Sequence, residues 1–150
     1  MRKMLLLATA AVLMTVAGGA FAAEIAVKML NKGAEGMMVF EPALVKLAPG
    51  DTVKFVATDK GHNAETIKGM LPADATPFLG KSGEDIAVTF EKPGIYGVKC
   101  LPHYGMGMVA MVVVGTPANL DEAKAVPQVG KAKQVMAGLF DKLSAQTAQK

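Results

Sequence analysis

Short segments with strand-like composition, separated by turn residues, extend along most of the chain. They are rich in Val, Ile, Phe and Thr, and they cover residues 25–30, 37–40, 43–47, 52–57, 86–90, 95–100 and 108–114. Pro49-Gly50-Asp51 and Lys92-Pro93-Gly94 provide turns, because proline presets one torsion and glycine accepts a positive one. About seven strands at this spacing predict an all-β Greek-key sandwich. Residues 64–80 have poor strand character and predict turns or a short helix across one end.

The periodicity changes after Gly115. Thr116-Pro117 can cap and open a helix, and Asn119 with Glu122 offers a second possible start. From residue 130 to about residue 147, apolar residues recur at three- and four-residue spacing, at Val135, Met136, Leu139, Phe140 and Leu143. The pattern predicts a C-terminal extension of two α-helices, from about residue 117, whose apolar stripe docks on the sandwich.

The first 22 residues have the organisation of a secretory signal peptide. A short positive region precedes an almost wholly apolar stretch over residues 4–17, and Ala20-Phe21-Ala22 favours cleavage after Ala22. A cut after Ala23 would place the bulky Phe21 where a small side chain is preferred. The apolar stretch is shorter than the roughly 20 residues that span a bilayer. We therefore expect residues 23–150 to form a single exported domain that is free of the membrane.

Much of the apparent basicity belongs to the leader. The whole chain carries a formal charge of +3, but loss of Arg2 and Lys3 leaves 14 basic against 13 acidic residues. A near-neutral domain with two tyrosines and no basic run gives no support to nucleic-acid binding. Its single cysteine cannot form an internal disulfide after export, and burial as a metal thiolate would protect it.

That cysteine lies in a run of candidate metal ligands. Cys100 stands three residues before His103 and eight before Met108, and His62 is the only other histidine. Thiolate, imidazole and thioether bind soft metals, and two imidazoles with one thiolate and a long axial methionine form a blue-copper electron-transfer site. Spacing alone leaves Met106 as a rival for the axial position.

Several motifs, spread over nearly the whole mature chain, resemble the pseudoazurins. They are Asn31-Lys32-Gly33-Ala34-Glu35-Gly36, Phe40-Glu41-Pro42, Pro49-Gly50-Asp51-Thr52-Val53, Lys60-Gly61-His62-Asn63, Val98-Lys99-Cys100, Pro102-His103-Tyr104, Met106-Gly107-Met108 and Pro117-Ala118-Asn119-Leu120-Asp121. The resemblance implies a periplasmic cupredoxin that carries one type 1 copper and transfers single electrons without being an enzyme. The implied ligands are His62, Cys100, His103 and Met108.

The resemblance also implies residues around the copper. Asn63 would tie the His62 segment to the ligand loop, and Met38 would lie near the exposed histidine, although a turn role and a core role respectively remain open. Pro102 lacks an N–H and cannot donate to the Cys100 sulfur. Lysines around an apolar patch would contact partners, at Lys32, Lys60, Lys81 and Lys99.

Redox proteins are the partners implied by the same resemblance. We expect transient complexes of a monomer with copper nitrite reductase in denitrification and with a c-type cytochrome, or with another periplasmic oxidoreductase. Leu101 and Leu79 depart from the family pattern, where a small polar residue and a lysine respectively occur.

Two other classes stay open at this point. An enzyme could use Cys100 as a nucleophile activated by His103 or His62, but the sequence offers no orienting acid and leaves Met108 unexplained. A copper carrier or a structural zinc site is the second class, although zinc does not need a thioether.

Overall fold

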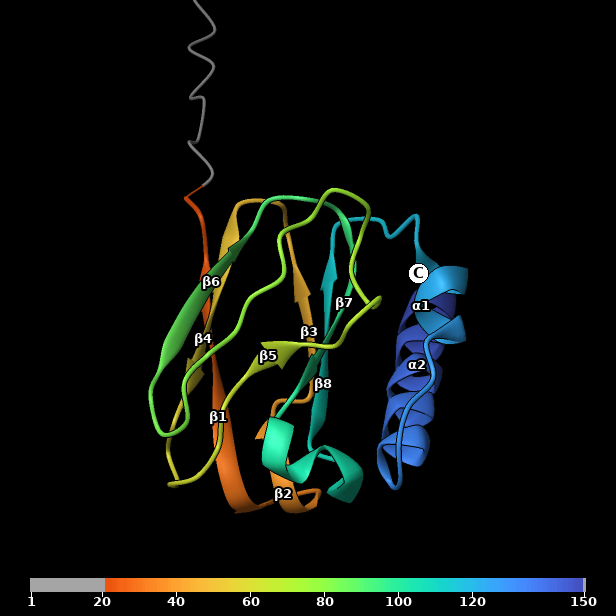
Figure 1. Cartoon of the computed structure of the whole chain (residues 1–150). Coiled ribbons are helices and arrows are strands. Elements are labelled where there is room, and N and C mark those ends of the chain that lie inside the picture. Colours follow the sequence, from red (N-terminus) through yellow and green to blue (C-terminus); the bar gives the residue numbers. More distant parts are fainter. Residues whose placement is uncertain (1–20, 150) are drawn as a thin grey trace, which may run out of the picture.

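Two four-stranded sheets face each other, and two helices cover the outer face of one sheet (Figure 1). This computed structural model describes residues 21–149. The predicted signal peptide therefore lies outside the described residues, except for Phe21 and Ala22.

The first sheet has the strand order β2-β1-β4-β6, and the second has the order β3-β8-β7-β5. The strands are β1 (Glu24–Gly33), β2 (Gly36–Glu41), β3 (Leu44–Leu47), β4 (Asp51–Val56), β5 (Glu65–Thr66), β6 (Ile86–Phe90), β7 (Gly94–Lys99) and β8 (Val109–Val114). The pairs β1–β4 and β3–β8 are parallel, and the remaining neighbours are antiparallel. The two-sheet sandwich predicted from the strand pattern is confirmed.

Strand β8 is buried on both faces, which explains its unbroken run of apolar residues. Ala110, Val112 and Val114 join the core between the sheets. The alternate side chains, Val109, Met111 and Val113, join a second apolar cluster beneath the helices. Successive side chains of a strand point to opposite faces, so this one strand connects the two clusters.

The helices α1 (Leu120–Ala125) and α2 (Ala132–Ala148) form the predicted C-terminal extension. The buried side of α2 consists of Ala132, Met136, Leu139, Phe140 and Leu143. The predicted apolar stripe therefore docks on the sandwich, although Val135 is only half-buried. No helix within residues 21–149 is long and apolar enough to cross a membrane.

The start of α1 and residues 64–80 each match one of the alternatives that the sequence left open. Helix α1 begins directly after Asn119, the second predicted start, but the Asn119 side chain does not cap the helix. Instead, its Oδ1 accepts the Ile95 N–H at 2.8 Å and its Nδ2 donates to the Ile95 carbonyl at 3.0 Å, which tethers the helix to β7. Of the two possibilities for residues 64–80, the structure shows turns and the short strand β5. Within this segment, the Ile67 N–H donates to the Gly97 carbonyl of β7 at 2.8 Å, which bonds the segment to the sheet.

Candidate metal centre

The ligand-rich run forms the connection between β7 and β8. Cys100 directly follows β7, the 3₁₀ helix η1 covers Leu101–Met106, and Met108 directly precedes β8. Helix η1 was not expected from the sequence. The Cys100 N–H donates to the Met108 carbonyl at 3.0 Å, and the Met108 N–H donates to the His103 carbonyl at 3.2 Å. These bonds close the loop and fix how far apart its cysteine, histidine and methionine can lie.

Three donor atoms converge at this loop. The Cys100 Sγ lies 3.4 Å from the His103 Nδ1 and 3.7 Å from the His62 Nδ1, and the two nitrogens are 3.1 Å apart. The centre of that triangle is about 2 Å from each atom, close to the roughly 2.0–2.3 Å that metal bonds to nitrogen and sulfur require. His62 comes from the segment after β4, so the fold brings it beside the loop from 38 residues away. The donor set fits a soft or borderline metal ion such as copper.

The other ring nitrogen of His62 determines which atom faces the metal. The His62 Nε2 lies 2.9 Å from the Asn31 Oδ1, which can only accept a hydrogen bond. The proton of the neutral ring is therefore on Nε2, and the Nδ1 lone pair faces Cys100 and His103. Asn31 is itself held by its backbone N–H, which donates to the Asp59 carboxylate at 2.7 Å.

Burial shifts the pKa of both buried donor groups, the His62 imidazole and the Cys100 thiol. Desolvation lowers the pKa of His62, with a further lowering by His103, so its imidazole stays neutral and able to bind metal. Desolvation also raises the pKa of the Cys100 thiol, and hydrogen bonds from the Asn63 and His103 backbone offset part of that effect. Metal binding must therefore release a proton from Cys100.

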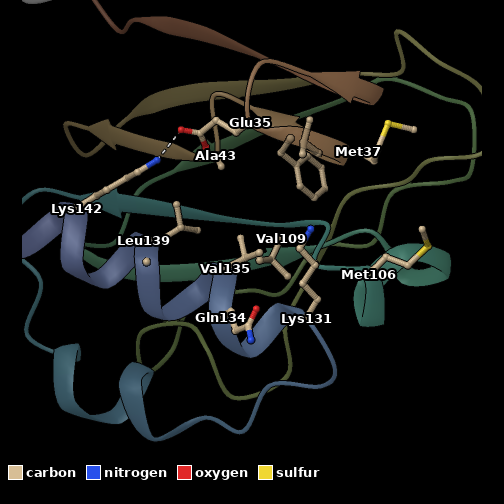
Figure 2. Close-up of a pocket in the computed structure, with 14 residues that line it drawn as sticks. Glu35, Met37, Ala43, Met106, Val109, Lys131, Gln134, Val135, Leu139 and Lys142 are labelled. Atoms are coloured by element: carbon tan, nitrogen blue, oxygen red, sulfur yellow. Dashed lines mark hydrogen bonds and ion pairs between the residues drawn. The ribbon is translucent and has the colours of Figure 1, made fainter.

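The two methionines of the loop lie in different surroundings. Met108 is fully buried and belongs to the same core cluster as Cys100. Met106 is 50% exposed and lines the groove between η1, β2 and α2, where Figure 2 shows it across from Lys131. Burial in the Cys100 cluster favours Met108 over Met106 as a thioether donor.

Of the predicted surrounding residues, Asn63 contacts the loop directly. Its Oδ1 accepts the Leu101 N–H at 2.8 Å. Pro102 opens η1 on the surface, and Met38 is half-buried against the core with a φ of 53°, rare for a residue other than glycine.

The predicted lysines divide into two groups. Lys32, Lys60 and Lys81 are exposed. Lys99 is not free, because its Nζ lies 3.3 Å from the Glu65 carboxylate and its side chain is 19% exposed. Large apolar side chains are exposed as well, among them Met37, Leu79, Leu101 and Met106.

Sequence reasoning did not single out Asn31 or Glu65. Asn31 opens one of the motifs that resemble the pseudoazurins, but no role was assigned to it, since its partners His62 and Asp59 are distant in sequence. Glu65 had one usable signal, an acidic residue between the apolar Ala64 and Ile67 two positions after Asn63.

Comparison with known proteins gives a consistent match. Residues 27–115 match the family described as copper binding proteins, plastocyanin/azurin family. The chain is 55% identical over 126 residues to the pseudoazurin of Methylorubrum extorquens, covering 83% of this chain and 85% of that one. It is 52% identical over 132 residues to the pseudoazurin of Paracoccus pantotrophus, covering 87% and 91%. The crystal structure of native pseudoazurin from Hyphomicrobium denitrificans superposes with a TM-score of 0.77 at 47% identity, covering 79% of this chain and 97% of that chain.

Proposed function

The chain belongs to the pseudoazurins, within the plastocyanin/azurin family of copper-binding proteins, and on this premise we propose which residues hold its copper. Pseudoazurins are cupredoxins that carry one type 1 copper and transfer electrons. The proposed ligand set is His62, Cys100, His103 and Met108. The observation that carries the proposal is the convergence of two imidazole Nδ1 atoms and one thiol sulfur around a single point.

Burial and backbone hydrogen bonds would hold the proposed ligands in place and keep water from them. A bound copper ion supplies the one-electron couple between Cu(II) and Cu(I). His62 and Cys100 are fully buried, and the loop that carries Cys100 and His103 is closed by backbone hydrogen bonds. These residues have little freedom to rearrange when the charge of the site changes, which keeps electron transfer fast. Half-buried His103 is the proposed route by which the electron leaves.

The absorption spectrum of the copper-loaded, oxidised protein tests the ligand set. We expect an intense blue colour that bleaches on reduction, whereas a colourless complex would contradict the proposal. Met108→Leu should change the spectrum and raise the reduction potential, because loss of the thioether disfavours Cu(II). Met106→Leu is the matched control and should change neither. An unchanged spectrum in Met108→Leu together with a changed one in Met106→Leu would assign the axial position to Met106.

We further propose that the mature protein acts in the periplasm as a monomer after loss of residues 1–22. Its proposed partners are copper nitrite reductase, in denitrification, and a c-type cytochrome as donor. Support comes from the family membership and from the exposed Lys32, Lys60 and Lys81. Such lysines would steer an acidic partner toward the copper end through a field that salt screens.

Charge reversal tests the steering. Lys32→Glu with Lys60→Glu should slow electron transfer to copper nitrite reductase by roughly tenfold at low ionic strength, with the copper spectrum unchanged. Lys46→Glu with Lys92→Glu makes the same change in net charge on exposed residues of β3 and of the turn between β6 and β7, and that turn lies at the end of the sandwich opposite η1 (Figure 1). This control should have little effect. Equal rates for both double variants across a salt series would eliminate a partner site at Lys32 and Lys60.

A further inference from the structure

Glu65 is a buried carboxylate beside the proposed copper ligands. It is 9% exposed, and it lies in β5, where it pairs with Lys99 of β7. A buried carboxylate is costly unless it is paired and hydrogen-bonded. Both Glu65 oxygens have partners: Oε1 lies 3.3 Å from the Lys99 Nζ, and Oε2 accepts a hydrogen bond from the Asn63 Nδ2 at 2.9 Å.

The second of these contacts fixes the orientation of the Asn63 amide. An ionised carboxylate only accepts hydrogen bonds, so Asn63 must turn its NH2 group toward Glu65. The same NH2 group donates to the Gly80 carbonyl at 3.2 Å. The Asn63 Oδ1 then faces the ligand loop and accepts the Leu101 N–H at 2.8 Å. A flipped amide would place two donors against each other at Leu101.

Lys99 completes the arrangement on the other side. Besides pairing with Glu65, its Nζ lies 5.1 Å from the centre of the Tyr104 ring, within range of a cation–π contact. The Glu65–Lys99 pair thus reaches neighbours of three proposed ligands. Asn63 follows His62, Leu101 follows Cys100, and Tyr104 follows His103.

We propose that Glu65, neutralised by Lys99, is a positioning residue that orients the Asn63 amide and thereby holds the ligand loop at Leu101. The Leu101 side chain is exposed, and its backbone N–H donates to the Asn63 Oδ1. The relevance of this role to copper rests on the proposed ligand set. This positioning role is separate from the contact with redox partners that the sequence led us to expect for Lys99.

Amide hydrogen exchange at Leu101 tests the proposal, measured by NMR on the full copper-loaded protein in its diamagnetic Cu(I) state. Glu65→Leu removes the acceptor for Asn63, so the Leu101 amide should exchange about tenfold faster, the effect of losing one hydrogen bond. Glu65→Gln with Lys99→Met keeps an acceptor oxygen for Asn63 without a lysine competing for it, and it should keep the parent rate. The Val112 amide in β8 serves as an internal reference. The blue absorption of the oxidised forms should change in Glu65→Leu and not in Glu65→Gln with Lys99→Met.

A third variant separates positioning from charge balance. Glu65→Leu with Lys99→Met leaves no unpaired buried charge and should recover the stability that Glu65→Leu loses. Leu101 should still exchange about tenfold faster in this double variant. Exchange at the parent rate would overturn the proposal, and if Glu65→Leu alone does not fold, the double variant decides. Failure of the ligand set would appear instead as a colourless parent protein, and the same exchange comparison would then be made on the metal-free proteins.

Discussion

On one face of β8, Ala110, Val112 and Val114 share a cluster with Cys100 and Met108, whereas the other face packs beneath α1 and α2. The first cluster places donor atoms, so its shape matters to the metal centre. The second joins the helices to β8, and none of its buried members is a proposed ligand. The contrast indicates that substitutions on the first face act mainly on copper and substitutions on the second act mainly on the free energy of unfolding.

Cys100→Ser gives the largest expected effect on the first side. The blue colour should be lost completely, because a hydroxyl cannot replace the copper–thiolate bond. Burying the hydroxyl should cost about 1–3 kcal/mol, so the sandwich should still fold, as circular dichroism can check. Blue absorbance that persists in this variant would refute the proposed centre.

Leu139→Ala probes the helix side, where Leu139 is 3% exposed. Truncation of a buried leucine should lower the free energy of unfolding by about 2–5 kcal/mol in urea titrations. The absorption spectrum should not move. Val129→Ala, at a side chain that is 48% exposed, is the control and should stay within about 0.5 kcal/mol. A shifted blue band in Leu139→Ala would break the separation between the two faces.

Pro102→Ala gives the smallest expected effect on the side of β8 that carries the metal centre. Alanine restores a backbone N–H near the Cys100 sulfur, and a hydrogen bond there withdraws electron density and favours Cu(I). The reduction potential, measured by protein voltammetry, should rise. A bond worth about 1 kcal/mol corresponds to about 40 mV for one electron. A lower potential with an intact fold would mean that the new donor does not reach the sulfur.

Local patterns in the sequence were sufficient for the sandwich, the two helices and most strand positions. The alternation of strand residues, the turn residues and the apolar stripe of α2 are all patterns among residues close together in the sequence, so they can be recognised without the fold. The short strand β5 was beyond that reasoning, because two residues carry no period and their pairing depends on β7. Asn119 is a residue type that commonly caps helices, but its side chain forms hydrogen bonds with the distant Ile95 backbone instead.

In the candidate centre, too, some features could be predicted from local sequence and others depend on long-range contacts. Cys100, His103 and Met108 stand in one short run, so their types and spacing identified the chemistry. The contacts that hold them are long-range: Asn31 reaches His62 across 31 residues, and Asn63 reaches Leu101 across 38. Lys99 illustrates the limit, since the resemblance placed it among partner lysines and only the fold shows its carboxylate partner.

The start of α2 lies against the loop that carries Cys100 and His103. The Lys131 N–H donates to the Gly105 carbonyl at 2.9 Å, and a side-chain carbon at Gly130, whose φ is 51°, would lie 2.4 Å from that oxygen. This contact between the segment before α2 and the ligand loop therefore limits the length that the loop can have. A loop with one residue more or fewer, grafted between Cys100 and Met108, would lose its fit to Gly130. We therefore expect that loop exchange with relatives succeeds only when the segment before α2 is exchanged as well.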